Sequence, residues 1–249
     1  MTASKANLAY PDGPCFLDSG EAALVVEFGR GVDPQTHERV LALDAALQAS
    51  PVEGLRESVP TYRSLMIHYD PLKLSRSDLI AYVHRALNTP GGLARLPDRW
   101  VMPCCYAPPF GEDVAEMAAK LGISPEQAIQ HHQSAVYRIY MYGFAPGFTY
   151  LGGLHEEIAV SRRATPRPPH AAGAVLVGGG LAAVATFSMP TGWYVVGQTP
   201  ERLYAPERDK AFLMEPGDEI RFLPIDAAEF AALEARALTG EIVARKEPL

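Results

Sequence analysis

The sequence has little cysteine, no excess of positive charge and no long apolar run, and each absence argues against a class of protein. Its three cysteines, Cys15, Cys104 and Cys105, are odd in number and form no C-x-x-C pair, so they predict neither a disulfide framework nor a structural zinc site. A net charge of −7 without clustered Lys and Arg argues against nucleic-acid binding. No apolar run approaches the roughly 18 to 20 residues that span a bilayer, and residues 1–14 lack the apolar core of a signal peptide. We therefore expect a cytoplasmic protein with reduced thiols and with neither a membrane nor a nucleic acid as partner.

The motifs of self-sufficient catalysis are also missing. There is no G-x-x-x-x-G-K-[ST] loop for a nucleotide and no G-x-S-x-G turn for a nucleophile. His155-Glu156 begins like the zinc motif H-E-x-x-H, but Ala159 stands in place of the second histidine. The adjacent His131 and His132 would point to different faces of a helix, so they cannot bind one metal ion together. We expect no metal site, and no cofactor bound by this chain alone.

What is present is the composition of a globular protein, with 249 residues of which 48% are hydrophobic, enough for one large domain or two small ones. In the first part, β-rich runs alternate with helical patterns. The expected elements are strands at 15–17, 22–28, 52–59 and 64–69, and helices after the N-cap residues Asp33 and Ser75. This β-β-α-β-β-α order predicts a small α+β sandwich with its helices on one face.

Each predicted helix has an apolar stripe that should face the sheet. The stripes comprise Val40, Leu41, Ala45 and Leu47 in the first helix and Leu79, Ile80, Val83 and Leu87 in the second. Thr89-Pro90-Gly91-Gly92 should end the second helix, and the chain from there to Arg99 should be a linker. We therefore predict an N-terminal α+β domain over residues 1–90 and a second domain over 91–249.

The second part has a different character. The expected elements are strands at 100–106 and 136–142, and helices at 113–121, from Ser124 and at 227–238. Cys104 and Cys105 should then be strand residues rather than redox centres. From Gly143, glycines and prolines recur every few residues and no helix is expected before Pro224, which is typical of a β-barrel or β-sandwich. No helix follows Gly178-Gly179-Gly180, which favours a hairpin turn over a phosphate cradle.

Four segments in series resemble one family. They are Tyr142–Leu154 (YGFAPGFTYLGGL), Arg162–Arg167 (RRATPR), Gly192–Pro200 (GWYVVGQTP) and Glu215–Phe222 (EPGDEIRF). They are similar to the G-F-x-P-G-F-x-Y-L-G-G-L, P-R-x-x-x-P-R, P-G-G-W-x-x-I-G-R-T-P and G-D-x-I-x-F motifs of the allophanate hydrolase subunit 1 family. That family, also described as carboxyltransferase domain C/D, includes the 5-oxoprolinase B subunit and a sporulation kinase inhibitor. The likeness extends from about Cys15 to Pro224, and His132 also matches a family histidine.

The resemblance implies an N-terminal ferredoxin-like α+β domain followed by a C-terminal cyclophilin-like β-barrel. It also implies a complex with a C-type subunit and, in the 5-oxoprolinase setting, with an A-type subunit. Such a complex uses ATP, with Mg where ATP is bound, to open the lactam of 5-oxoproline, or a related amide, to glutamate. The alternatives are a regulator that binds a sensor histidine kinase, and a divergent allophanate or urea amidolyase subunit. A prolyl isomerase is a fold analogy only.

The chain departs from the family pattern in the part of the barrel expected to face substrate. The positions are Ser161, Leu181, Ala185, Thr191 and Gln198. Leu181 replaces a glutamine and Ala185 replaces an aromatic residue. Either the substrate differs from 5-oxoproline, or the partner subunit supplies the polar contacts with the substrate.

The strongest candidates for chemistry are Arg162, Arg163 and Arg167. A guanidinium binds a carboxylate or a phosphate through two parallel hydrogen bonds, so Arg163 and Arg167 are candidate catalytic residues. The alternative is surface charge or a salt bridge to the partner. His132 is a third catalytic candidate, as an acid or base, and the alternative for it is a structural hydrogen bond.

The loop from Gly143 to Leu154 is the candidate contact surface. Several aromatic side chains in so short a segment cannot all point inward, so an exposed surface for a ligand or a partner is one interpretation. The other is a plug for the barrel, with Phe144, Phe148 and Leu151 in the core. Trp193 is likewise either a core residue or a pocket wall. The candidate substrate-binding or partner-facing residues are Phe144, Pro146, Gly147, Phe148, Tyr150, Gly192, Trp193 and Thr199.

Overall fold

The computed structural model describes residues 10, 13–88 and 95–248. They form two compact units, one up to residue 96 and one from residue 97 onward, each with a hydrophobic core of its own. The predicted boundary between residues 90 and 91, and the predicted helix stop at Thr89–Gly92, lie outside the described residues. None of the helices in the described ranges is both long and apolar enough to cross a membrane.

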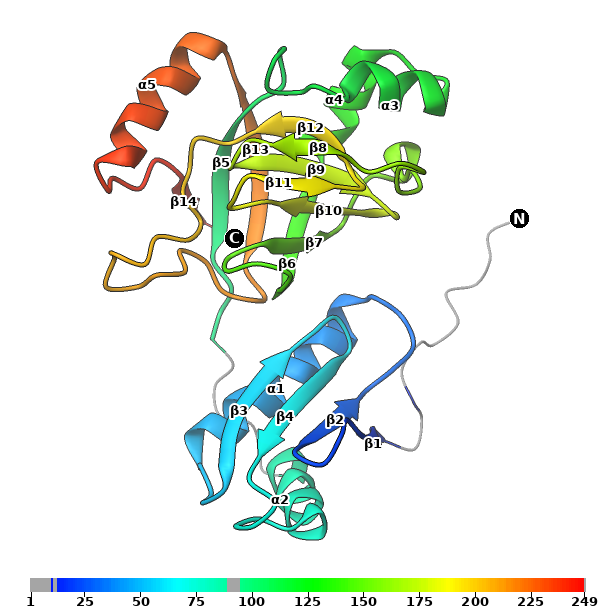
Figure 1. The fold of residues 1–249 in the computed structure, drawn as a ribbon, viewed down its shortest axis with the longest axis vertical. Helices are drawn as coiled ribbons and strands as arrows, with labels where there is room; N and C mark the ends of the chain where they lie inside the picture. Colours follow the sequence, from blue (N-terminus) through cyan, green and yellow to red (C-terminus); the bar gives the residue numbers. More distant parts are fainter. Residues whose placement is uncertain (1–9, 11–12, 89–94, 249) are drawn as a thin grey trace. The chain divides into compact units, whose positions relative to one another are not determined.

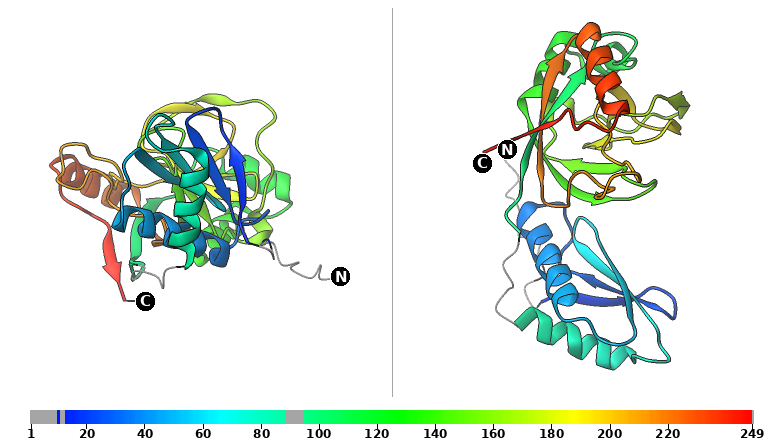
Figure 2. Two further views of the ribbon diagram at one scale, coloured as in Figure 1. Left: turned by 90° about the horizontal axis from the view of Figure 1, so that it is seen from below. Right: turned by 90° about the vertical axis from the view of Figure 1, so that its left-hand side faces the viewer.

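The first unit is a four-stranded antiparallel sheet with two helices on one of its faces (Figures 1 and 2). Its elements are β1 (Cys15–Asp18), β2 (Ala23–Glu27), α1 (Pro34–Ala49), β3 (Leu55–Pro60), β4 (Ser64–Tyr69) and α2 (Arg76–Asn88). The strands lie in the order β1-β2-β4-β3, which is that of a ferredoxin-like sheet whose last strand comes first in the chain. The predicted β-β-α-β-β-α order is confirmed.

Local signals placed the helices of this unit correctly, but their buried faces were predicted less well. Asp33 caps α1 by accepting a hydrogen bond from the Thr36 N–H at 2.9 Å. Ala45, predicted to be buried, is exposed, and Leu43 takes its place. The reason is helical geometry, because Leu43 lies between Val40 and Leu47 on the 3.6-residue repeat and Ala45 lies off it. In α2, Tyr82 joins Leu79 and Val83 as the buried residues, while Ile80 and Leu87 are half-buried.

The second unit contains a closed barrel (Figure 1). Its seven strands follow one another in the order β12-β9-β10-β7-β6-β13-β5, and a pairing of β12 with β5 closes the ring. The barrel strands are β5 (Arg99–Cys105), β6 (Val136–Tyr142), β7 (Thr149–Gly152), β9 (Ala174–Gly178), β10 (Leu181–Val184), β12 (Tyr194–Gln198) and β13 (Glu219–Ile225). The other elements are α3 (Val114–Leu121), α4 (Pro125–Ser134), η1 (Glu156–Ile158), β8 (Arg167–His170), β11 (Met189–Thr191), α5 (Ala227–Leu238) and β14 (Arg245–Glu247). The α+β fold with a barrel is therefore as predicted.

Side chains point alternately to the two faces of each strand, and this alternation builds two hydrophobic cores, one inside the barrel and one outside it. On β9, Val175 and Val177 point into the barrel, whereas Ala174 and Leu176 point outward. The outward residues are nevertheless fully buried, because the segment that includes Phe148 covers them. The outer core formed in this way is the foundation of the candidate site.

Several local predictions in this unit are confirmed. Gly179 and Gly180, with φ of 63° and 75°, make the two-residue turn of the β9–β10 hairpin. Cys104 and Cys105 are buried strand residues of β5. Ser124 and Gln127 form the expected capping box of α4.

Candidate functional site

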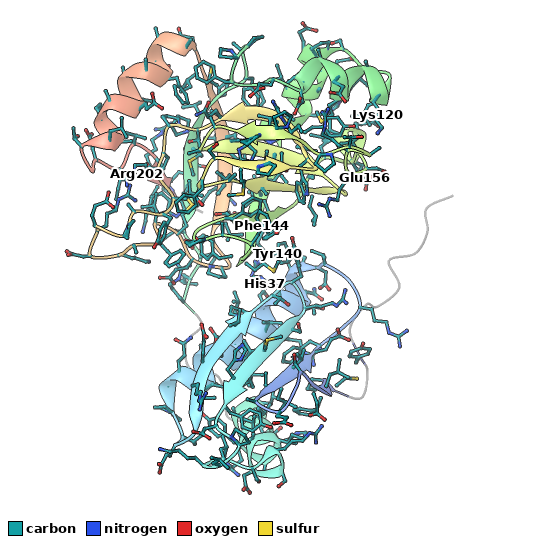
Figure 3. The ribbon with its side chains drawn as sticks, viewed as in Figure 1. His37, Lys120, Tyr140, Phe144, Glu156 and Arg202 are labelled. Carbon is teal, nitrogen blue, oxygen red and sulfur yellow. The ribbon has the colours of Figure 1, made fainter. Side chains whose placement is uncertain are left out.

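The loop between β6 and β7 both covers the outer core and exposes an aromatic ring. Phe148 is 5% exposed and packs on the core, while Phe144 is 78% exposed. Figure 3 labels Phe144 at this loop. Phe144 also has φ of 68°, a left-handed conformation that is costly for a non-glycine residue and is often found at functional sites. The plug interpretation holds for Phe148, which is buried, and the surface interpretation holds for Phe144, which is exposed.

Glycine is required at position 147 in this loop. Its φ is 71°, and an added Cβ would lie 2.4 Å from the Cβ of Tyr204. The neighbouring carbonyl of Pro146 accepts a hydrogen bond from the Thr186 hydroxyl at 2.6 Å. The loop is thus held against the segments that contain Thr186 and Tyr204, while Pro146 itself is exposed.

A row of rings connects this loop with the strand around Trp193. The ring centroids are 5.7 Å apart between Phe144 and Phe148, 5.0 Å between Phe148 and Tyr150, and 6.3 Å between Tyr150 and Trp193. Trp193 is half-buried and packs over Gly178, where an added Cβ would lie 2.9 Å from the indole. The structure therefore brings together the two aromatic segments that the sequence singled out, and Trp193 packs at the edge of the outer core.

A second group of rings, which the sequence did not indicate, continues this surface. Phe187, Tyr204 and Phe212 stack in succession at 6.0 and 5.1 Å. Phe187 is 42% exposed and Phe212 is 38% exposed. Together with Phe144, these three residues form what we call the aromatic surface of the barrel unit. No shared spacing in the sequence could have united them, because Gly147 and Thr186 join the two groups only through tertiary contacts.

Arg163 and Arg167 are paired with acidic residues of the same chain. Nη1 of Arg167 donates to Asp113 at 2.8 Å, and its other terminal nitrogen contacts Glu112. Nη1 of Arg163 donates to Glu116 at 2.8 Å and lies 3.4 Å from Asp113. A ligand anion would have to compete with these three carboxylates for the two guanidinium groups.

Asp113 is the centre of this network. Its Oδ2 accepts hydrogen bonds from Arg167 and from the backbone N–H of Val195, the latter at 2.7 Å. Asp113 also precedes α3, but its side chain makes no capping hydrogen bond because the carboxylate is used elsewhere. In the sequence, Glu112 and Asp113 look like ordinary helix-start residues, so their pairing with the arginines was missed.

Arg162 has a different environment from its two neighbours. Its side chain is exposed, and no hydrogen bond or ion pair joins it to any residue in the described part of the chain. The stem lies against Gly179, 3.6 Å from an added Cβ, and the guanidinium lies over Gly192, 3.4 Å from an added Cβ. Burial raises the pKa of the nearby Tyr150, and the positive charge of Arg162 opposes that rise.

His132 and Thr199 are buried and belong to neither group of rings. His132 is buried inside the barrel, where Nδ1 is 2.9 Å from the hydroxyl of Tyr106 and Nε2 has no partner among the described residues. Burial lowers the pKa of His132 to about 3, so the ring is neutral at physiological pH. Thr199 is buried too, and its hydroxyl accepts a hydrogen bond from the Glu201 N–H at 3.2 Å.

A cavity of about 430 Å³ adjoins the aromatic surface, because Phe187 and Tyr204 line it together with Thr199, Glu201 and Leu238. Three of the charged residues that line it, Glu201, Arg202 and Glu207, are already paired. Arg202 binds Glu207, and the fully buried Glu201 accepts hydrogen bonds from the backbone of Val243 and Ala244, each at 2.7 Å. These pairings make the cavity less suited to a charged ligand than the surface around Arg162.

Comparison with known proteins places this chain in a family. The family model described as carboxyltransferase domain, subdomain C and D, matches residues 14–214. The 5-oxoprolinase B subunit of Bacillus subtilis (strain 168) is 32% identical over 226 residues, which cover 86% of this chain and 93% of the relative. The 5-oxoprolinase B subunit of Escherichia coli O157:H7 is 32% identical over 210 residues, which cover 84% of this chain and 95% of the relative.

Solved structures are similar over most of the chain as well. TTHA0988 is 35% identical with a TM-score of 0.74 over 82% of this chain, which spans only 40% of that longer protein. The conserved uncharacterized protein PH0987 from Pyrococcus horikoshii is 33% identical with a TM-score of 0.51, over 87% of this chain and all of that one. The K. lactis urea amidolyase, at 16% identity and a TM-score of 0.74, matches 94% of this chain and 16% of its own, and shows a shared fold only.

Proposed function

The chain belongs to the family of the carboxyltransferase domain, subdomains C and D, and from this premise we propose that it is the B-type subunit of an ATP-dependent 5-oxoprolinase. In the proposed reaction, water opens the lactam amide bond of 5-oxoproline to give glutamate, and the complex couples this step to ATP hydrolysis. ATP, with Mg, is bound by the complex, and a C-type and an A-type subunit complete it. The chain by itself is inactive.

One observation carries the proposal. Two curated relatives, both of them 5-oxoprolinase B subunits, match this chain at 32% identity along 93% and 95% of their length. A match of that extent includes both units of the chain, rather than one shared module. The sequence adds that the motifs for a nucleotide loop and a nucleophile turn are lacking, which fits a subunit that depends on others.

The aromatic surface supports a partner subunit. Aromatic residues are enriched at the centres of protein interfaces, where they bury a large area at a small entropic cost. Phe144, Phe187 and Phe212 are all exposed in the isolated chain, and the strained backbone of Phe144 holds its ring outward. We assign this surface to the contact with the C-type subunit.

The acid–arginine network would act on catalysis indirectly. Because Asp113 and its neighbours already bind Arg163 and Arg167, the two arginines would hold the 161–167 segment in place rather than contact substrate. His132, neutral and enclosed in the barrel, would support the fold from within. These are proposed positioning roles for the three residues that the sequence indicated as catalytic.

Reconstitution tests the proposal. The chain, a C-type subunit and an A-type subunit are purified separately, mixed in all combinations, and assayed for glutamate released from 5-oxoproline with and without ATP and Mg. Turnover is expected only in the complete mixture with ATP. Turnover by this chain alone, or undiminished turnover when it is omitted, would overturn the assignment. Urea and allophanate serve as parallel substrates, and activity on them instead would identify a divergent subunit.

A further inference from the structure

We infer that Arg162 is the residue of this chain that recognises the carboxylate of the substrate, an inference that rests on the function proposed above. The expected ligand is a small, flat lactam with one carboxylate group. What points to this residue is the contrast among three neighbouring arginines that look equivalent in the sequence.

Only one of these three arginines offers an unneutralised charge. Arg163 and Arg167 face three carboxylates, those of Glu112, Asp113 and Glu116. The charges of Arg163 and Arg167 are therefore already balanced, and the three carboxylates would repel an added anion. Arg162 lies outside this network, and no carboxylate in the described residues pairs with it. A free guanidinium can form the bidentate contact that a carboxylate favours.

Hydrogen bonds hold the backbone on both sides of Arg162. The Arg163 N–H donates to the Gly192 carbonyl at 2.7 Å, and the Gly180 N–H donates to the Val160 carbonyl at 3.4 Å. The segment is thereby fixed across two turns, those of the β9–β10 hairpin and of Gly192. The Arg162 side chain runs over the bare backbone of these turns, where glycines allow close approach. A backbone held in this way leaves only the side chain to be ordered when a ligand binds.

The same corner supplies an apolar wall. Tyr150 and Trp193 lie beside Arg162, both half-buried and with their rings in an edge contact. Trp193 packs over Gly178 and the Arg162 stem over the adjacent Gly179, so both side chains lie at one hairpin turn, and the positive charge of Arg162 lowers the pKa of Tyr150 against the effect of burial. A five-membered lactam ring could pack on these aromatic side chains while its carboxylate meets the guanidinium. The row of rings through Phe148 joins this corner to the aromatic surface, which places the substrate next to the proposed subunit contact.

The test compares 5-oxoproline with 2-pyrrolidinone, the same lactam without the carboxylate. Arg162→Ala and Arg162→Lys are assembled into the complex, and the control is Arg236→Ala, an exposed arginine of α5 that is paired with Glu241. KM and kcat are measured for 5-oxoproline, and 2-pyrrolidinone is used as a competitive inhibitor. Calorimetric binding of 5-oxoproline to the assembled complex is measured in parallel.

We expect Arg162→Ala to raise KM and Kd for 5-oxoproline by about 10- to 100-fold, as for the loss of a hydrogen bond to a charged group. The kcat should change little, inhibition by 2-pyrrolidinone should be unchanged, and Arg162→Lys should be intermediate. Unchanged KM and Kd in Arg162→Ala, or an equal loss of affinity for both lactams, would overturn the inference. If the wild-type complex binds 5-oxoproline without turning it over, and Arg162→Ala weakens that binding, the proposed function is refuted but the carboxylate site is not. Absence of binding by the wild type would refute both.

Discussion

Arg167 and Asp113 are 54 residues apart in the chain, yet Nη1 of the first lies 2.8 Å from Oδ2 of the second. The same oxygen accepts a hydrogen bond from the backbone of Val195. One carboxylate therefore ties together the start of α3, the start of β8 and strand β12. Both side chains are almost fully buried, at 12% and 10% exposure, so solvent screens the ion pair only weakly.

Removing Arg167 should destabilise the barrel unit. The Arg167→Ala variant leaves Asp113 and Glu112 without their cation, and breaking a largely buried pair in this way typically costs about 3 kcal/mol. Arg167→Lys should be almost as harmful, because one ammonium cannot contact both carboxylates as the guanidinium does. Urea unfolding of the purified chain measures the loss. The control is Arg236→Ala, which breaks an exposed ion pair and should change stability by less than about 0.5 kcal/mol. Equal losses of stability in the two variants would show that the Arg167 network does not stabilise the barrel unit.

Gly147 should not tolerate a side chain. In Gly147→Ala the new Cβ would meet Tyr204 at 2.4 Å in a backbone conformation with φ of 71°, so the loop must move or strain by at least about 1 to 3 kcal/mol. Gly240 is the matched control, with φ of 93° and nothing within 4 Å of an added Cβ. Thermal melting should fall distinctly further for Gly147→Ala than for Gly240→Ala. Equal melting temperatures would show that the loop can yield freely.

The sequence indicated those features whose causes are local. Asp33 and Ser124 mark helix starts through contacts made within three residues, and helix α5 has the bounds that its pattern predicted. The meeting of Arg167 with Asp113, and that of Tyr150 with Trp193, depend on how the barrel closes. Closure is set by strand pairings distant in the chain, and no spacing rule predicts which side chains then face one another.

Stability should depend on pH through His132. Its pKa is about 3 in the folded chain and near 6.5 when unfolded, so the unfolded state binds the extra proton between these values. Stability should therefore fall as pH falls from about 6.5 towards 3, by at most about 1.4 kcal/mol per pH unit from this group. In His132→Phe this contribution to the slope of stability against pH should disappear. The variant also removes the hydrogen-bond partner of the Tyr106 hydroxyl, so the slopes are compared and not the absolute stabilities.

Urea titrations of wild type and His132→Phe at a series of pH values isolate the effect. The comparison is needed because His170, whose pKa burial also lowers, contributes a slope of the same sign in both proteins. Parallel curves for the two proteins would mean that His132 is not held neutral in the fold. KM for 5-oxoproline in the complex should be insensitive to this variant, since the ring lies inside the barrel.

The exposed ring of Phe144 should matter for assembly and not for folding. The side chain is 78% exposed in the isolated chain, so Phe144→Ala removes little buried area and should leave the unfolding curve nearly unchanged. An aromatic residue at the centre of an interface typically contributes about 2 kcal/mol or more, equivalent to a roughly 30-fold weaker Kd. We therefore expect the variant to bind the C-type subunit at least about tenfold more weakly, as measured by calorimetry. Leu72, at 95% exposure, is an apolar residue of the first unit and no part of the aromatic surface, and Leu72→Ala should bind as tightly as wild type. If Phe144→Ala binds as well as Leu72→Ala does, the subunit contact lies elsewhere, and the strained backbone at Phe144 needs another explanation.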